Sequence, residues 1–241
     1  MLRVTLIALA AGVLGTGAGG LIVALLGRPS NRVYSPALGF SGGIMLAVAF
    51  LELLPAAVEL GGALHAGAGL LSGALLIALL DRFLPHAQLA SGNNRFMRVG
   101  LLIGLGIAMH NFPEGLAIGA GMQAAPSLGL AVALMIALHN VPEGMAMGSP
   151  MALAGMRRCR MVSLVASAGL PMGLGAAAGY RLGELSPGFL ALSLGFAAGA
   201  MLFVVFDELI PAAQELGSGH RAAFGAVAGV LLGLLAHAWL S

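Results

Sequence analysis

Two copies of one short motif carry the side chains of this chain that are best suited to holding a metal ion. His110–Gly119 reads HNFPEGLAIG, and His139–Gly148 reads HNVPEGMAMG at an offset of 29. Residues i and i+4 of a helix share a face, so the histidine of each motif would stack over its glutamate, with the asparagine beside them. The candidate metal ligands are therefore His110, Asn111, Glu114, His139, Asn140 and Glu143.

The proline of each motif adds a backbone ligand to this set. Pro113 and Pro142 have no N–H, so the carbonyl four residues earlier loses its helical partner. Gly115 and Gly144 leave the position after each glutamate without a side chain. Two such helices would bring two imidazole nitrogens and two or more oxygens to one point.

A mixed nitrogen and oxygen set favours a borderline divalent metal. Zn²⁺ fits best, and Fe²⁺, Mn²⁺, Co²⁺ or Cd²⁺ fit with lower weight. Mg²⁺ and Ca²⁺ would require an all-oxygen site. The single cysteine, Cys159, excludes a cysteine-based metal cluster and any disulfide within one chain. Two glutamates neutralise one divalent ion, which predicts a single metal at the centre.

The composition places these motifs in a lipid bilayer. Only 8% of the 241 residues are charged and 59% are hydrophobic, whereas a soluble domain carries roughly 25% charged residues. A cytosolic enzyme, a nucleic-acid binder and a disordered protein are thereby excluded. Each membrane-spanning helix needs about 20 apolar residues. Eight stretches qualify: Val4–Leu26, Ala37–Leu60, Ala63–Leu80, Phe96–Met122, Ser127–Pro150, Met161–Tyr180, Gly188–Leu216 and Ala222–Leu240.

The arginines predict the orientation of these eight spans. Nine of the 11 arginines lie in the four links that share one side of the membrane, and only Arg3 and Arg181 fall on the other. Cytoplasmic links carry the excess of positive charge. We therefore expect both chain termini outside and the arginine-bearing links in the cytoplasm, in a multi-pass protein of the bacterial inner (plasma) membrane.

An internal repeat predicts how the spans are arranged. Leu38–Gly61 and Leu194–Gly217 are identical at 16 of 24 positions, in one register with an offset of 156. Spans one to three then correspond to spans six to eight, entered from the opposite side, as in the inverted repeats of many transporters. The predicted fold is an all-α membrane protein with eight transmembrane helices in a 3+2+3 bundle. It is a single domain, 1–241, made of a first triplet (1–80), the central motif pair (96–150) and a second triplet (161–240).

The same repeat predicts an acidic element at each face. Glu52 and Glu59 fall toward the outer end of the second span, while Asp207, Glu208 and Glu215 fall toward the cytoplasmic end of the seventh. Anionic mouths concentrate cations, so these residues are candidate pathway groups. Glu59 and Glu215 could equally be solvated helix ends. We interpret His237 as a packed or interfacial residue.

At this point the residues resemble a known family. HNFPEGLAIG on the fourth span and HNVPEGMAMG on the fifth are similar to the signature of the ZIP family (Zrt-/Irt-like proteins), with the bacterial GufA-like branch most similar. The resemblance implies import of Zn²⁺ and related ions as transported substrate, with no resident cofactor. It also implies a homodimer and an elevator-like motion of spans one, four, five and six. Two family carboxylates are missing: Asn140 and Leu170 stand where acids are common, which again predicts one metal.

Two other functions remain open at the sequence level. An intramembrane metalloenzyme could use the same cluster, but it would need an asymmetric site with an activated water and a base. The repeated ligands argue against that. An exporter or a passive metal channel would use the same centre, and the sequence does not fix direction, driving force or proton coupling.

Overall fold

Every regular element in the described part of the chain is a helix. The computed structural model describes residues 1–27, 31–83, 94–124, 126–181, 186–217 and 219–240. Its helices are α1 (Leu2–Leu26), α2 (Asn31–Val48), α3 (Leu54–Phe83), α4 (Asn94–Ala124), α5 (Pro126–Leu153), α6 (Arg158–Ser167), α7 (Leu170–Arg181), α8 (Pro187–Val204), α9 (Ile210–Leu216) and α10 (Arg221–Leu240). Two short π-helical segments, η1 (Ala49–Leu53) and η2 (Val205–Leu209), join α2 to α3 and α8 to α9.

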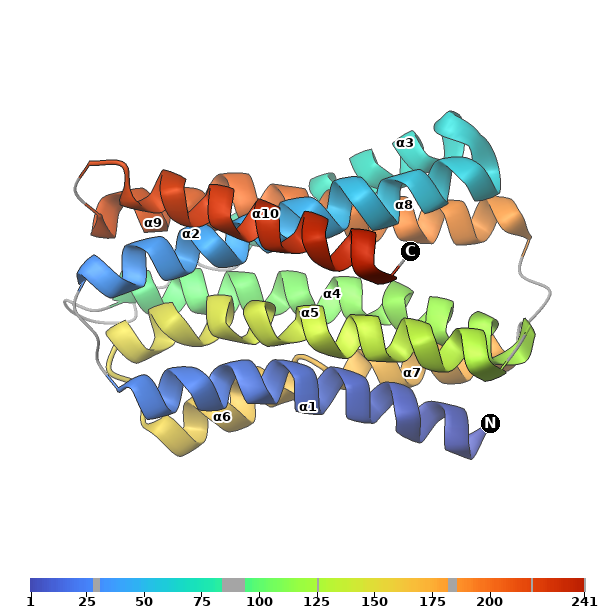
Figure 1. Ribbon diagram of the computed structural model, residues 1–241, viewed down its shortest axis with the longest axis horizontal. Coiled ribbons are helices and arrows are strands. Elements are labelled where there is room, and N and C mark those ends of the chain that lie inside the picture. Colours follow the sequence, from blue (N-terminus) through green and yellow to red (C-terminus); the bar gives the residue numbers. More distant parts are fainter. Residues whose placement is uncertain (28–30, 84–93, 125, 182–185, 218, 241) are drawn as a thin grey trace.

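The helices confirm an apolar, all-α protein. Six stretches of the described chain are long and apolar enough to cross a membrane. One of them, Arg32–Leu79, is 48 residues long, about twice what a single crossing needs. Within it the helix is interrupted at Gly62, where φ is 75°. Figure 1 shows the chain reversing direction inside α3. This stretch is long enough for two crossings, and eight crossings in all remains the prediction.

Prolines explain where the long helices deviate from regular geometry. The N–H of Leu54 donates to the carbonyl of Ala49, and that of Ile210 to Val205, so each bond spans five residues. Each is followed by a proline, whose ring would clash with the carbonyl four residues earlier in a regular helix. The wider π turn relieves that clash. The apolar pattern predicts continuous spans over both stretches, so these bulges are found only in the folded structure.

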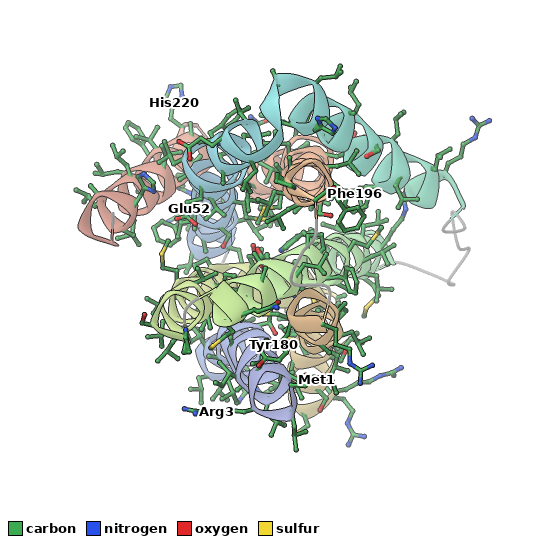
Figure 2. All side chains as sticks on the ribbon, turned by 90° about the vertical axis from the view of Figure 1, so that its right-hand side faces the viewer. Met1, Arg3, Glu52, Tyr180, Phe196 and His220 are labelled. Carbon is green, nitrogen blue, oxygen red and sulfur yellow. The ribbon has the colours of Figure 1, made fainter. Side chains whose placement is uncertain are left out.

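The helices form two groups. The motif lobe contains α1, α4, α5, α6 and α7, and the acidic lobe contains α2, η1, α3, α8, η2, α9 and α10; the most extensive packing lies within each lobe. Figure 2, which looks along the helices, shows the acidic lobe above and the motif lobe below, with Glu52 and Phe196 in the former and Met1 and Tyr180 in the latter. The lobes meet where α4 packs on α8 and where α5 packs on α2.

Glycine contacts within the motif lobe repeat with the offsets found in the sequence. A Cβ on Gly115 would overlap the carbonyl of Met172 in α7, and a Cβ on Gly144 would overlap the carbonyl of Thr16 in α1. The two glycines differ by 29 positions and their partners by 156. The absence of a side chain after each glutamate therefore has a packing reason, because each glycine is a point where a neighbouring helix backbone comes close.

The acidic lobe is built by the same device. Gly39 faces the carbonyl of Ala222, and its repeat partner Gly195 faces the carbonyl of Ala66. Both pairs follow the offset of 156. Such backbone-to-backbone contacts leave little freedom within a lobe, because any larger side chain would have to displace main chain rather than a flexible side chain.

The chain ends lie toward the same end of the molecule. Figure 1 marks both N and C toward its right-hand side. The Arg181 guanidinium at the end of α7 donates to the Met1 sulfur at 2.8 Å, which joins the ends of α1 and α7. The predicted orientation rests on the distribution of arginines, and one of them, Arg28, lies outside the described residues. The assignment of this end to the outside stays a prediction.

Candidate metal centre

Three of the predicted ligands meet in the middle of the motif lobe. His110 and Glu114 come from α4 and Glu143 from α5, and one ligand atom from each lies within 4.8 Å of the other two. All three side chains are at most 1% exposed. A charged group at the centre of a bilayer costs at least about 2.5 kcal/mol, so such groups mark pathways or partners rather than accidents. The cluster can bind a cation with one nitrogen and two carboxylates.

The two helices are already linked at this point. His110 Nε2 donates to Glu143 Oε2 at 3.0 Å, so the imidazole pairs with the carboxylate of the other helix. The i, i+4 spacing predicts that each histidine stacks over the glutamate of its own motif, whereas this hydrogen bond joins His110 to the glutamate of the other motif. A bound metal replaces the shared proton, because histidine and carboxylate ligands must be deprotonated.

The fourth central ligand cannot be placed at the level of its side chain. His139 lies in α5, one turn before Glu143, but its side chain is outside the described residues. Its backbone position is the repeat counterpart of His110.

Asn111 is held by the break between α6 and α7. Its Nδ2 donates to the carbonyl of Ala168 at 2.8 Å. Helix α6 ends at Ser167 and α7 begins at Leu170, so the Ala168 carbonyl lies between two helices. Since a carbonyl can only accept, this bond holds the amide nitrogen of Asn111 toward Ala168, and the amide oxygen lies on the other side of the group. Asn111 Oδ1 has no hydrogen-bond partner within the described chain and is fully buried, which leaves it available as a ligand.

Asn140 lacks the corresponding partner. The repeat would pair it with the carbonyl of Gly12, the counterpart of Ala168. That carbonyl instead accepts from Thr16 Oγ1 at 2.8 Å in the continuous helix α1. Neither amide atom of Asn140 has a hydrogen-bond partner in the part of the chain described, although the residue is fully buried. A buried amide without partners is costly, which points to a ligand that it would contact.

A cavity borders the candidate metal centre at Glu114. It encloses about 530 Å³ and is lined by both lobes. Glu114 borders it from the motif lobe, and Glu52, Glu59 and His237 border it from the acidic lobe. Glu52 and Glu59, which the repeat predicts at one face, thus border the same cavity. His237, which we interpreted as a packed or interfacial residue, lines this cavity too. Only its spacing of 156 from Asp81, a second titratable residue, could have drawn attention to it.

The second acidic element is arranged differently. Glu208 is half-buried on η2, and Glu215 is exposed near the end of α9. Asp207 is exposed and borders a separate cavity of about 410 Å³ whose lining comes from α3, α8 and η2. The pathway role expected for these residues stays a prediction.

Leu170 does not occupy the position that its alignment implied. Its side chain is 50% exposed at the first residue of α7. The residue of this segment that contacts the ligand set is Ala168, through its carbonyl. A carboxylate at 170 would therefore project away from the centre.

Comparisons with known proteins identify a family and several relatives of this chain. A family model described as "ZIP Zinc transporter" matches residues 87–241. The chain is 36% identical to "Zinc transporter ZupT" of Corynebacterium efficiens over 240 residues, which is 90% of each chain. It is 36% identical to the ZupT of Stenotrophomonas maltophilia, covering 93% of this chain and 90% of the relative. It is 37% identical to the ZupT of Chlorobium limicola, covering 92% and 90%.

Proposed function

This chain belongs to the ZIP family of zinc transporters, and from that premise we propose that it carries Zn²⁺ into the cytoplasm by alternating access through the buried cluster in the motif lobe. It is a multi-pass integral membrane protein, and its bacterial relatives indicate the plasma membrane. Its cargo is a divalent metal ion. Fe²⁺, Mn²⁺, Co²⁺ and Cd²⁺ share the ligand preferences of the site and are secondary candidates.

The proposed membrane arrangement has eight crossings in a 3+2+3 inverted repeat, with both termini outside. Three observations support it. The 48-residue stretch Arg32–Leu79 doubles back at Gly62. Helix α5 has 28 residues, which is long enough for a further crossing. The glycine contacts in both lobes repeat with the sequence offsets. The nine-to-two arginine split supplies the orientation.

The proposed metal ligands are His110, Glu114, His139 and Glu143, with Asn111 and Asn140 as weaker or water-mediated ligands. The single observation that carries this proposal is the convergence of His110, Glu114 and Glu143 within 4.8 Å in a fully buried site. Two carboxylates balance one divalent ion, and a second ion would remain uncompensated in a low-dielectric environment. We therefore expect one metal per protomer.

The proposed route begins at the cavity of about 530 Å³, where Glu52 and Glu59 attract the cation and pass it to Glu114. On the cytoplasmic side, Asp207 and Glu208 of η2 and Glu215 of α9 would receive the cation. The motif lobe contains the same spans that the family resemblance makes the moving unit. We accordingly propose an elevator-like displacement of the motif lobe against the acidic lobe, in a homodimer.

Zinc uptake by purified protein in liposomes tests this function. Wild-type protein should accumulate Zn²⁺ down its gradient with no co-substrate consumed, because no reaction is required. Glu143→Gln should reduce uptake to near the protein-free level, since it removes one of two balancing charges and the partner of His110. Asp81→Asn is the matched control, because it makes the same change of charge near the end of α3, at a residue outside the proposed site and route. Equal uptake by wild type and Glu143→Gln would refute the assigned centre, and uptake absent from wild type would refute the transport function.

A further inference from the structure

The two places where the lobes meet are related by the internal repeat, yet they differ. Helix α4 packs on α8, and α5 packs on α2. Offsets of 29 and 156 convert the first contact into the second. We call them the α4–α8 seam and the α5–α2 seam. Within each lobe the repeat is kept down to individual backbone contacts, so a departure at the seams marks the part of the molecule that changes.

The α4–α8 seam is tightly closed. A Cβ on Gly106 of α4 would lie 2.6 Å from a methyl of Val204 at the end of α8, closer than real contacts allow. Ile103 and Ile107, which flank Gly106 on α4, are at most 1% exposed, and so is Val204. Gly106 lies one turn before His110, on the side of the metal centre that the arginine pattern assigns to the cytoplasm.

The α5–α2 seam is hollow at the equivalent position. The repeat counterparts of Gly106 and Val204 are Met135 and Val48. Both line a cavity of about 320 Å³, which Glu52 also borders. Met135 and Glu52 line the larger cavity as well, so the space on this side continues to Glu114. The seam on the predicted outer side is therefore open while its counterpart is closed.

We propose that Gly106 and Val204 form the cytoplasmic gate of the transporter, and that it is closed in this outward-facing conformation. This inference rests on the proposed transport function and deepens it. Glycine at 106 lets α4 approach α8 closely enough to exclude water and ions from the cytoplasmic side of the centre. Release then requires α4 to move away from Val204.

The two seams open and close in opposition because α4 and α5 move together. A Cβ on Gly104 of α4 would lie 2.5 Å from Met147 Cε of α5, and one on Gly100 would lie 2.6 Å from Met151 Cγ. The remaining helices of the motif lobe are joined to α4 and α5 by the glycine contacts described above. A displacement that separates Gly106 from Val204 therefore carries Met135 toward Val48 and fills the outer cavity.

A disulfide across the closed gate tests this directly. A Cβ on Gly106 would lie 3.7 Å from the Cβ of Val204, within the range of about 3.5–4.5 Å that a disulfide requires. Gly106→Cys with Val204→Cys, in a Cys159→Ser background, should cross-link on mild oxidation. Zinc uptake into liposomes should then fall to the protein-free level. It should return after treatment with a phosphine reductant that is removed before the flux measurement.

A pair within the motif lobe is the matched control. A Cβ on Gly148 of α5 would lie 3.6 Å from the Cβ of Val23 in α1, within the same range. Gly148→Cys with Val23→Cys should also cross-link, but uptake should stay equal before and after reduction because both helices move together. The gate assignment is overturned if the Gly106–Val204 pair does not cross-link, or if the cross-linked protein transports as fast as the reduced one. Absence of uptake in both reduced pairs would instead count against the transport function.

A second set of variants tests the close approach without a cross-link. Gly106→Ala should lower uptake on the order of tenfold, because overpacking a closed interface destabilises it. Adding Val204→Ala removes the methyl that the new Cβ would meet and should restore most of the loss. An unchanged rate in Gly106→Ala, or no recovery in the double variant, would show that this contact is not the gate.

Discussion

At the scale of single residues, the centre gains its asymmetry from one hydroxyl. The two motifs are near-identical, yet Asn111 is tied to the Ala168 carbonyl while Asn140 is not tied to Gly12. The difference follows from Thr16, whose hydroxyl occupies the Gly12 carbonyl. Its repeat counterpart is Met172, which has no hydroxyl to offer. Asn140 is thereby left free to turn either amide atom toward the cation.

Removing that hydroxyl should tighten metal binding. In Thr16→Val the Gly12 carbonyl becomes available to Asn140 Nδ2, which would fix Oδ1 toward the centre. One net hydrogen bond contributes about 1 kcal/mol, or roughly fivefold in affinity. Titration calorimetry with Zn²⁺ on detergent-solubilised protein measures the change. Thr5→Val is the control, because Thr5 makes the same type of bond to Met1 at an exposed site. Equal or weaker binding by Thr16→Val would contradict this account of Asn140.

At the scale of secondary-structure elements, the helices are positioned by glycine more than by side-chain interdigitation. Close helix approach through small residues is common in membranes, where burial of apolar surface between helices brings no hydrophobic gain. In this protein the glycine of each motif directly follows a glutamate that we propose as a metal ligand. The residue that sets the distance between two helices is therefore next in sequence to the glutamate of the candidate site.

A methyl group at such a glycine should disturb both stability and transport. Gly144→Ala would place its Cβ against the Thr16 carbonyl and push α1 away from α5. Overpacking of this kind costs about 1–3 kcal/mol, so thermal unfolding in detergent should occur several degrees lower and zinc uptake should fall. Gly67→Ala in α3 is the control, since no atom lies within 4 Å of its added Cβ. Matching unfolding temperatures for the two variants would show that the motif glycine is not a packing contact.

At the scale of the whole molecule, the charge of the centre determines how many ions it holds. We expect one Zn²⁺ per protomer, counted by anomalous scattering at the zinc edge. Asn140→Asp should raise the count toward two, because it adds a third carboxylate to the buried set. Leu170→Glu should leave the count at one, because that side chain projects away from the centre. Two fully occupied central metals in the unaltered protein would refute the charge argument.

The orientation of the molecule can be tested with its single thiol. Cys159 is exposed at the start of α6, among arginines assigned to the cytoplasm. An impermeant maleimide should label it in spheroplasts only after the membrane is opened. Leu2→Cys in a Cys159→Ser background should be labelled from outside without opening, since Leu2 is 72% exposed at the opposite end of α1. The reverse labelling pattern would invert the proposed topology.

The sequence by itself determined the features that depend on local composition and spacing. Apolar stretches predict membrane helices because the bilayer requires about 20 apolar residues for each crossing. The two motifs predicted where His110, Glu114 and Glu143 would meet, because i and i+4 spacing fixes a helix face. The offset of 156 predicted related halves, and the contacts of both lobes follow it.

Only the tertiary structure decided which groups from different helices become partners. The pairing of His110 with Glu143, the anchoring of Asn111 and the placement of His237 beside a cavity all depend on how separate helices dock. The open and closed seams are the clearest case. Because the internal repeat relates the two seams, the sequence does not predict which of them is closed. The packed molecule makes both contacts but closes only one of them, because the motif lobe lies tight against α8 at Gly106 and leaves a cavity against α2 at Met135.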